Sequence, residues 1–189
     1  MVADDELDAA RRRFPLGDTV TGRVAHIPRP GAIGLLVDLG GSPTGFVDVL
    51  LLPRRTADWP EVGAVATFEV CQHRPGQVRL CPLGGGIPAA RPQRPWTDRQ
   101  WAAVRARHPV GSEATATVTS VTGANREYGL RFDDCTGVAE WRRDEPGPAV
   151  RTSHRYRVLR HLDSFGVAVV APVAGQATGA SPASGSPAG

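Results

Sequence analysis

Residues 9–17 read AARRRFPLG, and residues 103–111 read AVRARHPVG. The two stretches carry the same residue at every second position, and both end in Pro-x-Gly. The identical pairs are Ala9 and Ala103, Arg11 and Arg105, Arg13 and Arg107, Pro15 and Pro109, and Gly17 and Gly111. Further matches follow in the same order: Thr21 and Val24 with Thr115 and Val118, residues 33–35 (IGL) with 128–130 (YGL), and residues 44–48 (TGFVD) with 136–140 (TGVAE). Ordered matches over about forty residues predict a duplicated structural unit.

Each unit begins with a stretch that favours a short helix. In the second unit, Thr97 and Gln100 have the spacing of a capping box, and Trp96 and Trp101 have the spacing of the accompanying hydrophobic staple. The first unit runs from acidic residues to arginines, an order that complements the helix dipole. A proline follows each stretch and ends the expected helix.

Short alternating segments follow each helix. Residues 33–39 (IGLLVDL) place apolar side chains at every second position, the pattern of a half-buried strand. The expected strands cover residues 19–27, 33–39, 45–49, 64–72 and 77–83, then 114–121, 128–132, 137–141, 153–160 and 166–171. Five short strands with the longest loop after the third are typical of a small OB-type barrel, whose closure removes exposed strand edges. The predicted fold is therefore mostly β, with two five-stranded OB-type barrels, each preceded by a short α-helix.

The same pattern sets the expected domain boundaries. Residues 1–83 form a helix and the first barrel, and residues 96–172 form a helix and the second barrel. Residues 84–95 (GGGIPAARPQRP) are a Gly/Pro/Arg linker between them. Residues 173–189 are rich in Ala, Gly, Ser and Pro, a composition that predicts a disordered tail.

Composition excludes several classes of protein. Hydrophobic residues make up 41% of the 189 residues, which is enough for a packed core. No apolar run is long enough to span a membrane, and the acidic start MVADDELDAARRR lacks the apolar segment of a signal peptide, so we expect a cytoplasmic protein. All basic side chains other than histidine are arginine, which excludes lysine Schiff bases and phosphate-loop lysines. The net charge of +3 arises mostly from residues 84–109, here called the connector, which contain five arginines and a single acid, Asp98.

The order of motifs resembles a known family. Residues 22–27 (GRVAHI), 33–37 (IGLLV), 45–48 (GFVD), 62–70 (VGAVATFEV) and 78–83 (VRLCPL) follow one another as in the S-one-type RNA-binding domain. That domain is the repeated OB barrel of the largest protein of the bacterial small ribosomal subunit. The second unit is similar through residues 128–132 (YGLRF) and 137–140 (GVAE). The resemblance covers about 16–83 and 110–172 and implies binding of single-stranded RNA.

The positions that the family uses to contact RNA are altered in the first unit. The resemblance places Ile33 and Leu36 where the family has two base-stacking aromatics, and Asp48 where it has a histidine. Stacking on aromatic faces contributes about 1–3 kcal/mol per base, which aliphatic side chains do not supply. Only Arg79 matches the family at the closing strand. The Ile33 and Leu36 face is therefore expected to pack or to contact a protein.

The second unit matches these positions better. Tyr128 stands at the first aromatic position, Arg131 at the second, and Trp141 follows Glu140, which replaces the histidine. The candidate nucleic-acid-binding residues are Tyr128, Arg131, Trp141, Arg142, Arg143, Arg79, Arg105 and Arg107. A structural role for the aromatics and a solvated rim of arginines is the alternative.

Two functions remain open from the sequence. The first is a non-catalytic protein that binds single-stranded RNA; the second is a protein-interaction or immunity-type module that uses the Ile33 and Leu36 face. We expect no cofactor and no metal site, because Cys71, Cys81 and His73 lack a fourth ligand. The adjacent acids Asp133 and Asp134 are expected to lie in a turn, and the sequence contains no recognisable set of catalytic residues. We therefore expect that the protein is not an enzyme.

Overall fold

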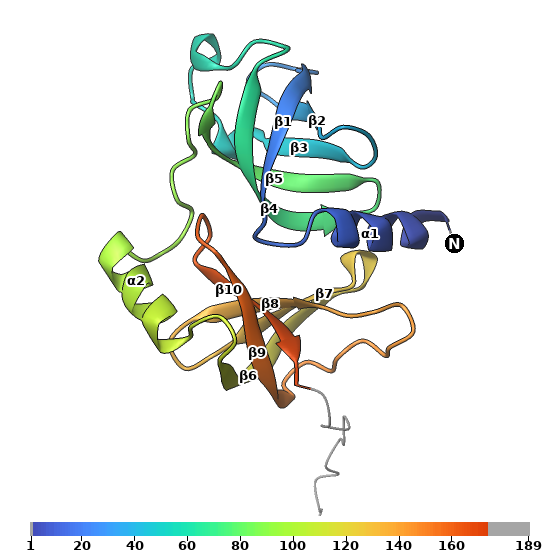
Figure 1. Cartoon of the computed structure of the whole chain (residues 1–189), viewed down its shortest axis with the longest axis vertical. Helices are drawn as coiled ribbons and strands as arrows, with labels where there is room; N and C mark the ends of the chain where they lie inside the picture. Colours follow the sequence, from blue (N-terminus) through green and yellow to red (C-terminus); the bar gives the residue numbers. More distant parts are fainter. Residues whose placement is uncertain (1, 174–189) are drawn as a thin grey trace, which may run out of the picture.

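The computed structural model describes residues 2–173 and consists of two β-barrels, each preceded in the chain by a short helix (Figure 1). The predicted fold class is confirmed. The predicted disordered tail lies outside the described residues, apart from Val173. Among the described residues, no helix has the length and apolar character needed to cross a bilayer.

Both barrels have the same strand connectivity. The first contains α1 (Val2–Arg13), β1 (Thr19–His26), β2 (Gly34–Asp38), β3 (Thr44–Asp48), the short helices η1 (Val49–Leu51) and η2 (Thr56–Asp58), β4 (Val65–Arg74) and β5 (Gln77–Gly85). The second contains α2 (Asp98–Arg107), β6 (Glu113–Thr122), η3 (Gly123–Asn125), β7 (Glu127–Arg131), β8 (Thr136–Glu140), β9 (Ser153–Leu162) and β10 (Val167–Pro172). Each sheet closes in the order first, second, third, fifth, fourth strand, and only the third and fifth strands pair in parallel.

The strand pairing corrects the alignment of the two units at the second strand. Val37 pairs with Val24, and Leu130 pairs with Val118, so Leu130 is the counterpart of Val37. Tyr128 therefore corresponds to Leu35, not to Ile33 as the sequence match suggested. The shift of two residues keeps each side chain on the same face of the strand. It makes Tyr128 the counterpart of the buried Leu35 and no longer of the exposed Ile33, so Tyr128 takes a core position.

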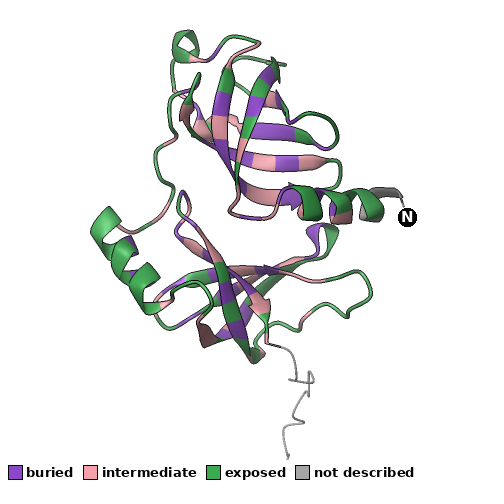
Figure 2. Ribbon diagram, in the orientation of Figure 1, coloured by how far each residue is buried: buried purple, intermediate pink, exposed green. Residues whose placement is uncertain are grey.

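The expected capping of α2 is confirmed. The backbone N–H of Gln100 donates to Thr97 Oγ1 at 3.3 Å, and the backbone N–H of Thr97 donates to Gln100 Oε1 at 2.9 Å. The rings of Trp96 and Trp101 stack with their centroids 5.7 Å apart, as a hydrophobic staple requires. Trp101 and Val104 are buried, whereas most of α2 is exposed (Figure 2).

The two barrels pack against each other through equivalent faces. Phe46 pairs with Arg79 across β3 and β5, and Val138 pairs with Val169 across the corresponding strands β8 and β10. Val169 and Leu162 are buried within the apolar cluster of the first barrel, which also contacts other second-barrel side chains. The apolar cluster of the first barrel thus extends across the contact between the barrels, while the interior of the second barrel forms a cluster of its own.

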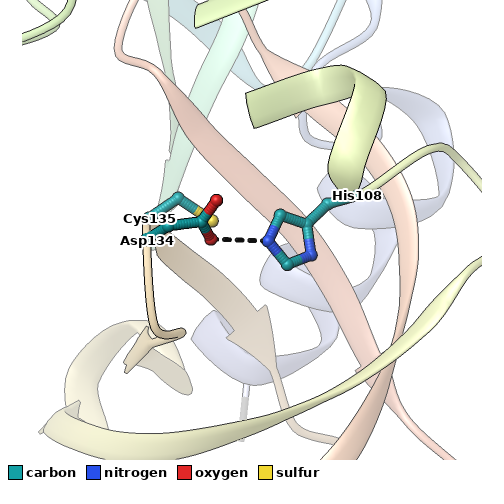
Figure 3. Close-up of side chains that lie close together, drawn as sticks. All are labelled: His108, Asp134 and Cys135. Carbon is teal, nitrogen blue, oxygen red and sulfur yellow. Dashed lines mark hydrogen bonds and ion pairs between the residues drawn. The ribbon is translucent and has the colours of Figure 1, made fainter. Parts of the chain in front are cut away.

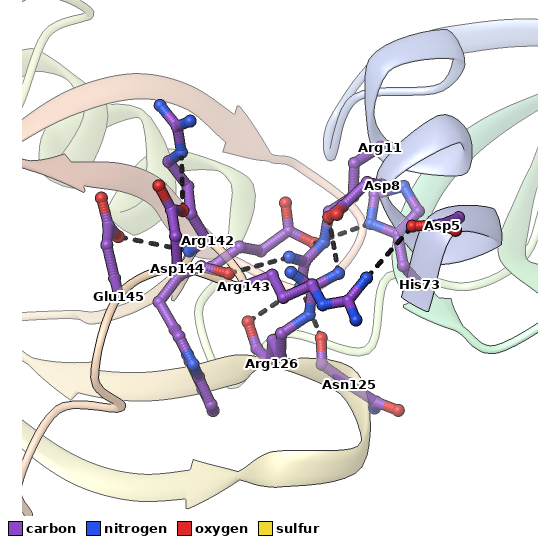
Figure 4. Close-up of polar contacts among 12 residues, drawn as sticks. Asp5, Asp8, Arg11, His73, Asn125, Arg126, Arg142, Arg143, Asp144 and Glu145 are labelled. Atoms are coloured by element: carbon purple, nitrogen blue, oxygen red, sulfur yellow. Dashed lines mark hydrogen bonds and ion pairs between the residues drawn. The ribbon is translucent and has the colours of Figure 1, made fainter. Parts of the chain in front are cut away.

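Polar contacts from α1 reinforce this packing (Figure 4). The guanidinium of Arg11 pairs with Glu140 at 2.8 Å and donates to the carbonyls of Asn125, Arg126 and Trp141. Because these groups belong to the second barrel, Arg11 connects the first helix to the other half of the molecule.

A buried histidine adds to the same contact. His73 Nε2 donates to the carbonyl of Phe14 at 2.7 Å, and Nδ1 lies 2.8 Å from Glu140 Oε1. The family resemblance aligned Glu140 with a histidine that contacts RNA. In this structure its carboxylate instead joins the two barrels.

Glu69 provides a second polar connection between the barrels. Its carboxylate, only 5% exposed, accepts the backbone N–H groups of Asp163 and Ser164 at 2.8 and 3.1 Å. These residues form the turn between β9 and β10. Burial raises the pKa of Glu69, and hydrogen bonds from the turn oppose that effect.

Replacing Glu69 by Ala removes the acceptor for both N–H groups. We expect Glu69→Ala to lower the free energy of unfolding by about 1–3 kcal/mol, because buried donors without a partner keep their desolvation cost. Urea unfolding followed by tryptophan fluorescence measures this change. Glu61→Ala, at an exposed acid of the same barrel, is the control and should match the wild type. Equal stabilities for the two variants would contradict this role of Glu69.

Candidate functional site

A cleft of about 470 Å³ lies where the two barrels meet. Its apolar walls come from Phe46 and Leu80 of the first barrel and from Val138, Leu162, Phe165 and Val167 of the second. Charged side chains at the cleft are Asp48, Arg74, Arg79 and Glu127. Both barrels are needed to form this cleft.

A second cavity of about 580 Å³ extends the cleft along the linker. It is lined by residues 50–54 after β3 and by linker residues 88–91 and Gln93. Leu50, Leu51 and Gln93 line both cavities, so the two adjoin. We call the combined space the inter-barrel groove.

Arg79 occupies the wall of the groove on β5. Its guanidinium carbon lies 4.2 Å from the centroid of the Phe46 ring, and its Nη1 lies 3.6 Å from Asp48. Burial lowers the pKa of Arg79, and the neighbouring charge of Arg74 lowers it further, but an arginine stays protonated at neutral pH. Its Nε is buried without a hydrogen-bond partner among the described residues.

Three further arginines give the groove a positive rim. Arg54, Arg74 and Arg91 are exposed, and within residues 2–173 no carboxylate lies within 4 Å of their guanidinium nitrogens. Of the two acids in the groove, Asp48 faces Arg79, and burial raises the pKa of Glu127. Unneutralised arginines beside an apolar cleft are suited to an anionic ligand with apolar parts.

The structure places the predicted aromatic residues away from this groove. Tyr128 is only 3% exposed and packs inside the second barrel, with its ring centroid 6.1 Å from that of Trp141 and 6.2 Å from that of Tyr156. Burial raises the pKa of Tyr128. A base could not stack on this ring unless the barrel opened.

The predicted arginines occupy several separate surfaces, and most are already paired with acids. Arg105 pairs with Asp163, Arg107 with Asp134, Arg142 with Asp144, and Arg143 with Asp5 of α1. Arg131 is exposed at the end of β7. Only Arg79 of the predicted set lines the groove, so nucleic-acid contact by the others stays a prediction.

The proposed protein-contact face lies on the first barrel. Ile33 is 43% exposed just before β2, and Leu36 pairs with Phe46 across β2 and β3. Leu36, Phe46 and Arg79 are therefore successive residues across three neighbouring strands. A protein partner for this face stays a prediction.

Apart from Arg79, the arginines that line the groove were not among the residues predicted from the sequence. Arg54 follows β3, Arg74 ends β4, and Arg91 lies in the linker. The basic surplus of the connector is the one sequence signal that pointed to Arg91. No pattern along the chain links it to the other two, because the folded barrels bring them together.

The structure also brings together a cysteine and a histidine that are far apart in the sequence (Figure 3). His108 Nε2 lies 2.6 Å from Asp134 Oδ1, beside Cys135. Burial raises the pKa of Cys135 to about 11, so its thiol is protonated at neutral pH and is not an activated nucleophile. Burial also acts to raise the pKa of Asp134, but hydrogen bonds from His108 and Arg107 outweigh it and lower that pKa.

No protein-family model and no curated protein matches this chain. Among solved structures, a multidomain protein with nucleic acid binding domains from Streptococcus pneumoniae TIGR4 is 12% identical, with a TM-score of 0.31 over 82% of this chain and 51% of that one. GSP13 from Bacillus subtilis is 22% identical, with a TM-score of 0.32 over 35% of this chain and 54% of that one. This chain thus matches about half the length of each structure. Likenesses at these TM-scores do not assign a function.

The raised pKa values of Glu69 and Glu127 predict how stability depends on pH. Between the ordinary carboxyl value of 4.5 and the raised value, the folded state binds more protons than the unfolded state. The contribution of these groups to the free energy of unfolding therefore increases as pH falls from neutral towards 5.

Urea unfolding at pH 7.5 and pH 5 measures this effect. We expect Glu127→Gln to reduce the gain in stability on acidification relative to the wild type, while Glu61→Gln retains the wild-type gain. If Glu127→Gln shows the same pH dependence as the wild type, burial of this carboxyl does not control its protonation.

Proposed function

We propose that this chain is a non-catalytic, OB-type protein of the S-one kind that binds single-stranded RNA in the inter-barrel groove. The observation that carries the proposal is that three unneutralised arginines line the groove beside an apolar cleft. In the wall of this cleft, Arg79 stacks on the ring of Phe46. The groove lies partly on β3, a strand whose face serves as the ligand-binding surface in many OB folds.

The chemistry of the groove favours a single strand. Proteins that bind single-stranded nucleic acid combine a positive groove along the backbone with surfaces that receive the bases. Arg54 and Arg91 line the linker part of the groove and are suited to phosphates, while Phe46 and Phe165 line the apolar part. The bases of a duplex are paired and stacked, so they could not enter the apolar cleft.

The choice of RNA rests on the family resemblance of the motifs, and the proposal includes a cytoplasmic location. The free state of Cys71, Cys81 and Cys135 agrees with a reducing compartment. Few phosphate contacts and near-neutral barrels support modest affinity with a clear dependence on salt.

A protein partner is the second candidate function. Leu50 is 82% exposed where the two cavities join, and Ile33 is exposed on the same barrel. Exposed apolar side chains of this kind are suited to a protein contact, which would use the apolar walls more than the arginines.

Removing two groove arginines tests the RNA proposal. We expect Arg74→Ala/Arg91→Ala to weaken binding of a fluorescein-labelled single-stranded RNA by about tenfold near physiological salt, because two phosphate contacts are lost. The slope of log K against log salt should become less negative by about 1.4. Fluorescence anisotropy at several salt concentrations measures both values.

A charge-matched control is Arg12→Ala/Arg99→Ala, which removes two exposed arginines outside the groove and should bind like the wild type. Arg131→Ala examines the second-barrel surface predicted from the sequence. Loss of binding in Arg131→Ala with full binding in the groove variant would move the site to the second barrel. No RNA binding by the wild type at low salt would favour the protein partner.

A further inference from the structure

The C-terminal end of α2 and the turn before β8 bring three metal-ligating side chains together. One ligand atom from each of His108, Asp134 and Cys135 lies within 4.8 Å of the other two. Figure 3 shows the imidazole extending from the helix end towards the carboxylate and the sulfur on the turn. We propose that these three residues form a binding site for a borderline-soft divalent cation, Zn²⁺ in particular.

The first barrel provides an internal comparison for this cluster. His108 directly follows the last arginine of α2, as Phe14 follows the last arginine of α1. Asp134 and Cys135 precede the first residue of β8, as Ser42 and Pro43 precede the first residue of β3. The corresponding positions of the first barrel thus hold a phenylalanine, a serine and a proline.

The first barrel joins its helix to the same turn without metal-ligating side chains. Arg13 donates to the carbonyls of Leu39, Gly40 and Ser42 at distances of 3.2, 2.8 and 2.9 Å. Packing of the helix end on the turn therefore does not require an imidazole, a carboxylate or a thiol. In the second barrel, Arg107 and His108 make the corresponding link through Asp134, and the thiol of Cys135 lies beside it.

The donor set matches the coordination chemistry of zinc. Zn²⁺ binds imidazole nitrogen, carboxylate oxygen and thiolate sulfur in tetrahedral sites, and three protein ligands leave a fourth position for water. Mg²⁺ and Ca²⁺ prefer oxygen ligands, so one carboxylate would hold them poorly. The mixture of nitrogen, oxygen and sulfur thus selects a zinc-like ion.

An ion at this cluster would replace a contact that already exists between two of its members. In the metal-free arrangement, His108 and Asp134 share a hydrogen bond of 2.6 Å, which the ion would replace with bonds to both groups. Arg107 Nε lies 2.5 Å from the other carboxylate oxygen, Asp134 Oδ2, and would hold this carboxylate in place while it binds the ion. The thiol proton of Cys135 leaves to solvent as the sulfur binds.

Cobalt provides a direct spectroscopic test on the full chain. After treatment with a chelator and its removal, the protein is titrated with Co²⁺ while its absorption spectrum is recorded. We expect one equivalent of Co²⁺ to give the visible bands of a tetrahedral ion and a near-ultraviolet thiolate-to-cobalt band, and Zn²⁺ to displace it. Thermal unfolding should shift to higher temperature with Zn²⁺, because the ion binds the folded state.

The variants separate this site from other thiols. Cys135→Ala should remove the thiolate band, and Cys71→Ala should keep it. His108→Phe and Asp134→Ser carry the residues of the first barrel, which that fold already accommodates. Each should weaken Co²⁺ binding by more than about 100-fold, since even the loss of a residue that only holds a ligand in place costs about 10–100-fold. Circular dichroism checks that the variants are folded.

The proposal is overturned if tenfold excess Co²⁺ gives no thiolate band at micromolar protein. It is also overturned if the band persists in Cys135→Ala or disappears in Cys71→Ala. RNA binding plays no part in these measurements, so their outcome is independent of the function proposed for the groove.

Discussion

The contact between the equivalent faces of the two barrels is the interaction on which the rest of the structure depends. Val138 and Val169 of the second barrel join the apolar cluster of the first barrel, and Val138 lines the same cleft as Phe46 and Arg79. Arg11 places its charge in a partly buried site and is compensated by Glu140 and by backbone carbonyls of the other barrel. Because a buried charge is tolerated only with such partners, the polar contacts hold the apolar faces in one relative position. The groove exists only in that arrangement.

Much of the fold could be predicted because its signals are local. The capping box of Thr97 and Gln100 involves neighbouring residues, and the alternation in β2 reflects one strand with one buried side. The counterpart of Tyr128 was harder to assign, because a shift of two residues preserves the alternation of a strand. Strand pairing resolves it, and the irregular register between Val118 and Ser120 in β6 is a feature that the alternation does not encode.

The candidate site was predicted poorly because it depends on contacts between distant segments. Arg143 is paired with Asp5, and Arg107 is paired with Asp134. The acid partly neutralises each arginine, so neither attracts an anionic ligand as strongly as its position in the sequence suggests. The positive groove instead combines Arg54, Arg74 and Arg91 from separate segments. Whether a carboxylate neutralises an arginine is decided by tertiary packing. The family resemblance is carried by the motifs of each barrel separately, so it carries no information about the contact between the two barrels.

The two barrels differ at corresponding positions, so that the groove depends on both of them. The first barrel supplies Arg79 and a leucine at position 36 on its face, while the second has Val169 and Gly129 at the corresponding places. The second face is therefore small and apolar, which suits packing better than recognition of an anion. It forms the opposite wall of a cleft whose charged groups come mainly from the first barrel and the linker. The second barrel thus supplies the second wall of the groove, and positions outside that contact, such as His108 and its counterpart Phe14, differ in their chemistry.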